Sequence, residues 1–325
     1  MRSVSKAVFQ ALAASKSMKA LASRYGLRTE RSFARRFVAG ETVADAIAVA
    51  RRIESAGMTQ TLALLGESVS TMAEADKATR AYLAAISEIA AAGIGRNISL
   101  ELTQLGLNVD RATCVDNLRR VLDGAGPHQF FVRIDMEDSR YTQLTFDIFE
   151  TLWQQGYRNA GVVVQSSLPR SIDDVRRMNA LGARVRLVKG AYREPRRVAY
   201  RSKAQVDAAF VEIMGVLLAE GTLPAIATHD PVMIAATREF AARHQIGADR
   251  YEFQMLFGVR RDLQAQLSAQ GYGMRVYIPF GRQWFPYVMR RLGERPANVG
   301  FVLRSLLRET GGHKSRAEKS PSHDR

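Results

Sequence analysis

The stretch RVYIPFGRQWFPYVMRRLGERPAN, residues 275–298, predicts a strand, a glycine turn and a short helix in succession. Apolar side chains alternate with other residues over its first five positions, and the strand should end at Pro279, which has no N–H to donate to a sheet. Gly281 permits the turn that follows, because glycine adopts backbone angles closed to other residues. A helix is expected to begin close to Trp284. The rest of the chain repeats this unit of strand and helix.

Two adjacent arginines, Arg290 and Arg291, lie on the expected helix. Tyr287, Arg291 and Glu294 are spaced by four and three residues, so they share one helix face. Guanidinium groups bind a carboxylate or phosphate in a fixed plane, and two of them beside one strand end suggest an anion clamp. A solvated basic helix face is the alternative, since surface arginine pairs are common.

Segments of strand length alternate with helical ones along the chain. Strands are expected at Thr61–Leu65, Asn97–Leu102, Phe130–Met136, Gly161–Gln165, Arg184–Lys189, Pro224–His229, Tyr251–Leu256 and Arg275–Pro279. Segments whose apolar residues recur with helical spacing lie before and between these strands. They include Glu41–Ala56, Tyr141–Gln155, Ser171–Leu181, Ala204–Glu220, Pro231–His244 and Arg260–Ala269. Eight mostly apolar strands separated by helices predict an α/β fold, a (β/α)8 TIM-type barrel with additional N-terminal helices.

A doubly wound sheet is the competing fold. It needs a glycine-rich phosphate loop after a strand, but the one candidate, Gly93-Ile94-Gly95, precedes a strand and lacks the third glycine. Walker, HExxH and GxSxG motifs are absent from the sequence, which argues against the phosphate-loop, zinc-protease and serine-hydrolase classes.

Length and composition suit one large barrel, since the chain has 325 residues of which 46% are hydrophobic. We expect a helical segment at residues 1–57, the barrel at residues 58–311 and a disordered polar tail at residues 312–325. Cys114 is the only cysteine, which excludes an internal disulfide and a multi-cysteine metal site. No histidine pair has ligand spacing and no apolar run is long enough to span a bilayer, so we expect no metal and a soluble or peripheral protein.

The formal charge of +15 is concentrated near the start of the chain. Residues 1–36 carry nine lysines or arginines and a single acid, Glu30. Such a segment could lie on an anionic membrane or on nucleic acid. It also resembles a transit peptide, and a solvated helix packed on the domain is a further reading.

Function in such a barrel collects at the carboxyl ends of the strands. Those ends carry, in chain order, Glu67, Glu101, Asp135, Gln165, Lys189, His229, Leu256 and Tyr277. Seven of the eight are polar, which predicts an active site there. Lys189 after a buried strand could form a Schiff base, so a lyase is one alternative. The other is an organic cofactor held across the mouth by Arg186, Lys189 and Gln165, with the arginine pair as substrate clamp.

A series of motifs resembles the flavin-dependent proline dehydrogenases, in the monofunctional bacterial form. The motifs are LLGESV at 64–69, LTQLGL at 102–107, VRIDMED at 132–138, VVVQSSLPR at 162–170, RLVKGAYREP at 186–195, ATHD at 227–230, YEFQMLFG at 251–258 and RRLGERPAN at 290–298. The resemblance implies a distorted (β/α)8 barrel that binds FAD and oxidises L-proline to Δ1-pyrroline-5-carboxylate, in proline catabolism to glutamate. It further implies hydride transfer to flavin N5, electron transfer to membrane quinone, and a cytoplasmic enzyme peripherally associated with the inner membrane, with no nucleic-acid partner.

The resemblance also assigns roles to individual residues. The pocket around the proline ring would be formed by Asp135, Tyr277, Leu256 and Glu101, with Arg186 reaching flavin N5. The proline carboxylate would be clamped by Arg290 and Arg291, with Glu294 in an ion pair that holds the helix. The FAD contacts would be Gln165, Arg186, Val188, Lys189, Gly190, Ala191, Lys203, Thr228 and His229.

Glu101 is where the chain departs from this family, whose members usually carry lysine in the pattern ISxKLTQLG. A lysine would lower the pKa of the substrate amine, whereas a carboxylate should raise it unless Glu101 is protonated or paired with an arginine. Tyr277 supports proline as the substrate, because relatives resembling hydroxyproline oxidases lack that tyrosine.

Overall fold

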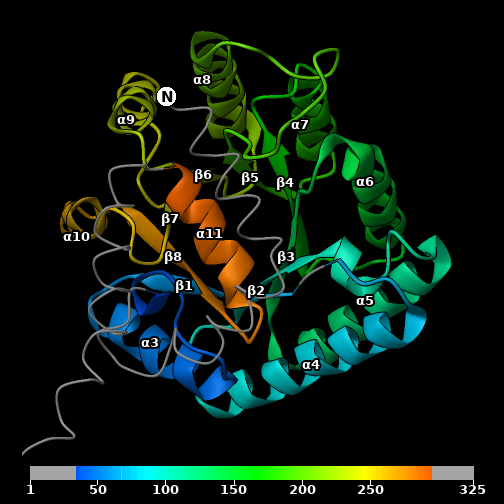
Figure 1. Ribbon diagram of the computed structural model, residues 1–325. Coiled ribbons are helices and arrows are strands. Elements are labelled where there is room, and N and C mark those ends of the chain that lie inside the picture. Colours follow the sequence, from blue (N-terminus) through cyan, green and yellow to red (C-terminus); the bar gives the residue numbers. More distant parts are fainter. Residues whose placement is uncertain (1–33, 67, 295–325) are drawn as a thin grey trace, which may run out of the picture.

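The computed structural model describes residues 34–66 and 68–294, with the backbone alone for residues 290–294. Eight parallel strands close into a barrel in the order of the sequence, which confirms the predicted TIM-type fold (Figure 1). The strands are β1 Thr59–Leu64, β2 Asn97–Glu101, β3 Phe131–Asp135, β4 Ala160–Gln165, β5 Arg184–Val188, β6 Ala225–Ala227, β7 Glu252–Leu256 and β8 Gly273–Phe280.

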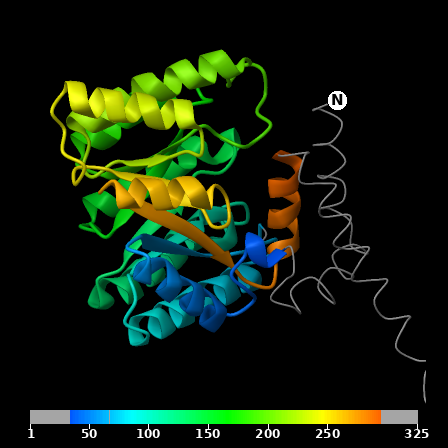
Figure 2. The same ribbon diagram turned by 90° about the vertical axis from the view of Figure 1, so that its left-hand side faces the viewer.

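Helices surround the barrel (Figures 1 and 2). They are α3 Val43–Ser55, α4 Met72–Ala91, α5 Arg111–Ala125, α6 Ser139–Gln154, α7 Ser171–Ala180, α8 Lys203–Glu220, α9 Pro231–Arg243, α10 Arg261–Ala269 and α11 Trp284–Glu294, with 3-10 turns η1 Ala34–Arg36, η2 Leu102–Leu105 and η3 Gly126–His128. Capping boxes at Thr42, Thr71 and Ser202 start α3, α4 and α8, since each hydroxyl accepts the backbone N–H three residues on.

Each strand differs from its predicted length by at least one residue, and β6 and β8 differ most. Strand β6 is shorter than predicted, with Pro224 just before it and Asp230 capping α9 just beyond its end. Strand β8 runs one residue past Pro279. The proline is tolerated because pairing with β7 has already ended at Leu256 and Tyr277, so the missing N–H breaks no bond of that ladder.

The strands alternate between an apolar outer face and a polar inner face, although their sequences read as mostly apolar runs. Leu62, Ile98 and Val132 are paired in register and fully buried against the helices. On each strand the residues next to these point the other way, into the barrel interior, where Ser99 and Arg133 are also buried. The interior of this barrel is therefore largely polar.

Arg133 illustrates how the interior accommodates charge. Its Nη1 donates to the carbonyl oxygens of Val162 at 2.9 Å and Arg184 at 2.6 Å, so it ties β3 to β4 and β5. Gly161 leaves the room for this, because a Cβ there would lie 2.8 Å from Nη1 and 2.5 Å from the Arg184 oxygen. The guanidinium also lies 4.8 Å from the centre of the Phe131 ring.

Helix α11 crosses the carboxyl end of the barrel and rests on the segment that precedes α3 (Figures 1 and 2). Its buried residues, among them Trp284 and Val288, form a separate apolar cluster with Phe37 and Val38. Trp284 Nε1 also donates to Glu41 at 3.2 Å. Gly281, at φ 128°, makes the turn into α11 as predicted.

The predicted division of the chain remains a prediction. Helix α3 packs against β1 and β8. Residues 1–33 and the expected tail at 312–325 lie outside the described residues. Within the described ranges, no helix is both long and apolar enough to cross a membrane.

Candidate active site

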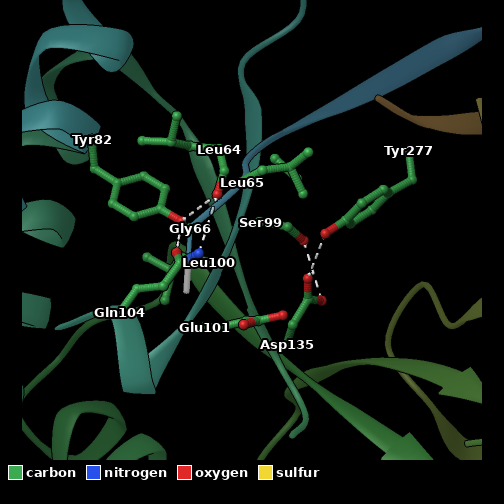
Figure 3. Close-up of a pocket in the computed structure, with 11 residues that line it drawn as sticks. Leu64, Leu65, Gly66, Tyr82, Ser99, Leu100, Glu101, Gln104, Asp135 and Tyr277 are labelled. Carbon is green, nitrogen blue, oxygen red and sulfur yellow. Dashed lines mark hydrogen bonds between the residues drawn. The ribbon is translucent and has the colours of Figure 1, made fainter. Parts of the chain in front are cut away.

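A cavity lies at the carboxyl end of the barrel, where parallel strands bring all their ends together. Figure 3 shows side chains from several separate elements around it. The lining residues are Ala63, Leu64, Leu65, Gly66, Tyr82, Ser99, Leu100, Glu101, Gln104, Asp135 and Tyr277. Three predicted site residues, Glu101, Asp135 and Tyr277, therefore share one pocket.

Asp135 is the centre of a hydrogen-bond network at the base of this pocket. Its Oδ1 accepts from Arg186 Nη1 at 2.6 Å and from the Ser99 hydroxyl at 3.3 Å. Its Oδ2 accepts from the Tyr277 hydroxyl at 3.0 Å. The Arg186 side chain is 6% exposed and that of Asp135 17%, so this ion pair is shielded from water and holds both groups in place.

Tyr277 is a neutral donor in this network. Burial raises the pKa of its hydroxyl well above the ordinary value, and the charges of Asp135 and Glu101 raise it further. The Arg186 guanidinium lies 5.5 Å from the centre of the Tyr277 ring, within the range of a cation–π contact. The phenol thus keeps its proton at neutral pH and donates a hydrogen bond to Asp135.

Ser99 is a network residue that the sequence reasoning missed. Arg186 Nη1 and Nη2 both lie 3.3 Å from its hydroxyl oxygen, and the hydroxyl in turn donates to Asp135. Its position two residues before Glu101 on β2 could have revealed it, because alternate residues of a strand share a face. Arg186 Nε, by contrast, is buried and has no hydrogen-bond partner within the described ranges.

Glu101 ends β2 and lies in register with Asp135 on β3. Its side chain is half-buried. Figure 3 shows Glu101 and Asp135 next to each other at one side of the cavity. Glu101 therefore lies in the pocket and not on the outer surface of the barrel.

Glu137 and Gln165 form a second set of contacts. Gln165 was a predicted site residue, whereas Glu137 was not. The Gln165 amide donates to the Glu137 carbonyl at 2.8 Å, while Thr103 donates its backbone N–H and hydroxyl to the Glu137 carboxylate at 3.0 and 2.5 Å. Burial raises the pKa of Glu137. These bonds fix Gln165, at the end of β4, relative to β2 and β3.

Tyr82 and Gln104 form the pocket wall beside β1, and sequence reasoning missed both. The Tyr82 hydroxyl bonds Gln104 Oε1, and Gln104 Nε2 donates to the Leu64 carbonyl at 3.3 Å. A Cβ at Gly66 would lie 2.7 Å from that Nε2, so the loop after β1 approaches Gln104 closely. Nothing in the local pattern of α4 marks Tyr82 as a pocket residue.

Lys189 lies in a cluster of four charges that joins the ends of β5 and β6 to the start of α8. Its Nζ is 2.5 Å from Asp207 and 2.7 Å from Asp230, and Lys203 pairs with the same two acids. A Schiff base would require Lys189 Nζ to leave both ion pairs. Lys203 is the outer member, with 75% of its side chain exposed.

The remaining predicted cofactor residues lie on the same side of the mouth. Gly190 has φ 100°, and a Cβ there would lie 2.3 Å from Ser167 Oγ. His229 Nε2 accepts the backbone N–H of Leu256 at 2.9 Å, which joins the ends of β6 and β7. The others are placed beside them, with Val188 half-buried at the end of β5, Ala191 exposed and Thr228 buried.

Four predicted residues cannot be placed in this network. The side chains of Arg290, Arg291 and Glu294 lie outside what the structure describes, although their backbone belongs to α11. Glu67, at the end of β1, is likewise outside the described residues.

Comparison with known proteins agrees with this architecture. The proline dehydrogenase family profile matches residues 46–304. The chain belongs to the proline dehydrogenase family. Proline dehydrogenase 1 of Bacillus subtilis is 39% identical over 302 residues, which cover 93% of this chain and 99% of that protein. Proline dehydrogenase of Deinococcus radiodurans is 38% identical over 281 residues, covering 85% and 91%. The chain is thus of the monofunctional bacterial type.

A solved structure supports the fold assignment within this family. Proline utilization A (PutA) from Bdellovibrio bacteriovorus, inactivated by N-propargylglycine, superimposes with a TM-score of 0.75 at 27% identity. The alignment covers 80% of this chain but only 32% of that protein. The chain therefore corresponds to one part of the longer PutA chain.

Proposed function

We propose that the chain is an FAD-dependent oxidoreductase that converts L-proline to Δ1-pyrroline-5-carboxylate and passes the electrons to a quinone. Family membership supports proline as substrate. The observation that carries the proposal is the buried network of Arg186, Asp135 and Tyr277 at the base of a pocket at the barrel mouth. Such a network holds charge and hydrogen-bond donors in fixed positions, which favours catalysis by orientation and electrostatics.

The residues around β4 and β5 fit a flavin. Arg186 Nε is a buried donor without a partner in the described part of the chain, as a ring acceptor would require. Gly190 has no room for a side chain beside Ser167 and Gln165, which leaves its backbone open to a flat ring. The groups that would hold FAD are Gln165, Arg186, Val188, Lys189, Gly190, Ala191, Lys203, Thr228 and His229. When bound, FAD supplies a two-electron acceptor for the hydride of the carbon next to the substrate's ring nitrogen.

The protein's own side chains position the substrate in this proposal. Asp135, Tyr277 and Leu256 contact the ring, while Arg290 and Arg291 bind the carboxylate from α11, with Glu294 paired to hold that helix. Arg186 keeps a fixed positive charge at the site, so that negative charge arriving there is stabilised. Because α11 crosses the mouth, the helix also limits the access of water.

Anaerobic titration with L-proline tests this function. We expect the purified protein to be yellow and its visible flavin absorbance to bleach on addition of L-proline, then to return when a soluble quinone is added. Cyclopentanecarboxylate is the control ligand, since it has the same shape but no nitrogen to support oxidation. A colourless protein that borohydride traps with a keto acid would instead favour a Schiff-base lyase at Lys189.

We further propose that the enzyme works in the cytoplasm, peripherally bound to the inner membrane through its basic N-terminal segment. Residues 1–36 carry nine lysines or arginines against one acid. Each cation near an anionic surface contributes about 1 kcal/mol, within a Debye length of about 10 Å at 0.1 M salt. Residues 1–33 lie outside the described residues, so the charge of the sequence alone supports this part of the proposal.

Vesicle sedimentation measures that membrane binding. The protein should sediment with anionic vesicles at low salt, stay in solution with neutral ones, and dissociate as salt is raised. A Lys16→Gln variant should bind more weakly, while Arg243→Gln on α9 serves as a control that removes the same single charge. Equal sedimentation with neutral and anionic vesicles would show that the basic segment serves another purpose.

A further inference from the structure

We propose that Glu137 is a positioning residue for the cofactor, because it fixes the side-chain amide of Gln165 with its oxygen on the flavin side. Glu137 lies two residues beyond Asp135, in the loop between β3 and α6. The inference rests on the proposed function, which places Gln165 among the groups that hold FAD, and deepens it by naming the residue that orients Gln165.

The orientation of the Gln165 amide carries the first step. Gln165 ends β4, and its Nε2 donates to the backbone carbonyl of Glu137 at 2.8 Å. Because a carbonyl oxygen only accepts hydrogen bonds, the nitrogen end of the amide has to face Glu137. The other end, Oε1, lies on the side of Gly190, where a Cβ added to the glycine would be 3.1 Å from it. Gln165 therefore presents its oxygen there as an acceptor.

The anchor of the Glu137 carbonyl carries the second step. The side chain of the same residue ties its loop to η2, because the Glu137 carboxylate accepts the Thr103 backbone N–H at 3.0 Å and the Thr103 hydroxyl at 2.5 Å. Thr103 is held in turn by the loop after β1. Its hydroxyl accepts from Ser68 Oγ at 3.2 Å, and its carbonyl accepts the Val69 N–H at 3.3 Å. The carbonyl that orients Gln165 is thus fixed to two neighbouring loops.

Burial makes this anchor specific to the side chain of Gln165. Glu137 is 6% exposed and Thr103 is fully buried, so bonds lost between them are poorly replaced by water. The backbone of Gln165 does not depend on Glu137, since its carbonyl accepts the Ser171 hydroxyl at 2.7 Å and the Leu168 N–H at 3.0 Å. Loss of the anchor should therefore release the amide and leave the end of β4 in place.

The test follows the flavin in the FAD-loaded full chain. Thr103→Val removes the hydroxyl that bonds Glu137 and keeps the shape, Thr103→Ser keeps the hydroxyl, and Glu137→Ala removes the whole anchor. Thr237→Val on α9 is the matched control, because that hydroxyl is equally buried and bonds the Met233 carbonyl of its own helix at 2.8 Å. Two quantities are measured for each protein. They are the dissociation constant of FAD, from the fluorescence of flavin released on dilution, and the visible absorbance spectrum of the bound flavin.

We expect Thr103→Val and Glu137→Ala to raise the dissociation constant of FAD about tenfold and to shift the absorbance bands of the bound flavin, because the Gln165 amide loses its fixed orientation. Thr103→Ser and Thr237→Val should match the wild type in both quantities. An unchanged constant and spectrum in Thr103→Val would overturn the inference. So would equal changes in Thr237→Val, which a general loss of stability predicts, or a failure of Thr103→Ser to keep the wild-type values.

A double variant shows whether Glu137 acts through Gln165. In a Gln165→Ala protein, adding Thr103→Val should change neither quantity further, since the amide that the anchor holds is absent. Additive effects of the two substitutions would overturn the positioning role. If the wild type carries no FAD, the proposed function fails as well. A wild type that carries FAD and a Thr103→Val protein with the same constant and spectrum overturn the role of Glu137 alone.

Discussion

Replacing Asp135 with alanine is expected to lower the free energy of unfolding by about 3–5 kcal/mol, because a buried guanidinium loses its only carboxylate within the described network. The Arg186 side chain is 6% exposed, so water can replace the lost carboxylate only in part. Ser99 and Tyr277 would also lose their acceptor. Urea denaturation of wild type and variant, matched in FAD content, measures this difference.

The matched control for this prediction is Asp116→Ala on α5. Asp116 pairs with Arg119 at 2.8 Å, but its side chain is 68% exposed. An exposed ion pair of this kind contributes about 1 kcal/mol or less, so the control should unfold almost like wild type. Similar losses in the two variants would mean that Asp135 is not held in a buried pair.

The Asp135 variants also separate charge from shape. Asp135→Asn keeps an oxygen for the Tyr277 hydroxyl but removes the charge that Arg186 pairs with. If orientation of Tyr277 were the main role of Asp135, the asparagine variant should retain most of the activity. Loss of activity in both variants, with stable protein in the asparagine case, would assign the effect to the ion pair with Arg186.

The barrel and much of the pocket could be predicted from the sequence, because both depend on the spacing of apolar residues within short segments. Strand-length apolar segments give the strands, and parallel strands place their carboxyl ends at one edge of the barrel. The residues predicted at those ends include Glu101, Asp135 and Tyr277, and all three line one pocket in the structure. Tyr277 was also found, although it lies inside β8, three residues before the last residue of that strand.

Contacts between distant segments were not predictable in the same way. Tyr82 comes from the middle of α4, and its bond to Gln104 depends on how that helix packs on the barrel. Lys189 looked like a reactive amine in the sequence, but its partners Asp207 and Asp230 lie 18 and 41 residues further along the chain. Only the folded chain shows that this amine is held between two carboxylates.

Interior polarity was the third feature that the sequence concealed. Strands such as β2 and β3 read as apolar runs, yet every second residue faces a polar interior that holds Ser99, Arg133 and Asp135. A period of two is hard to recognise when strands are only five residues long. The network below the pocket therefore emerged only from the register of neighbouring strands.

The arginine pair of α11 gives the other large effect that we predict. Arg291→Met should weaken the binding of a cyclic carboxylate about ten- to a hundredfold, since a charge-assisted hydrogen bond to a carboxylate is worth about 1.5–3 kcal/mol. The methionine keeps most of the length of the side chain, and α11 is held by its apolar contacts with residues 34–38, so the helix should stay in place. The dissociation constant of cyclopentanecarboxylate, followed by its effect on the flavin spectrum, isolates the clamp because this ligand lacks the ring ammonium.

Arg243→Met provides the control for the clamp, because it removes the same charge from an exposed position at the last residue of α9, where the side chain is 67% accessible. The control should bind the carboxylate like wild type. Since Arg290 would still be present, the Arg291 variant should retain weak binding, and Arg290→Met combined with Arg291→Met should lose it. An unchanged dissociation constant in Arg291→Met would remove this residue from the clamp and leave Arg290 to bind the carboxylate.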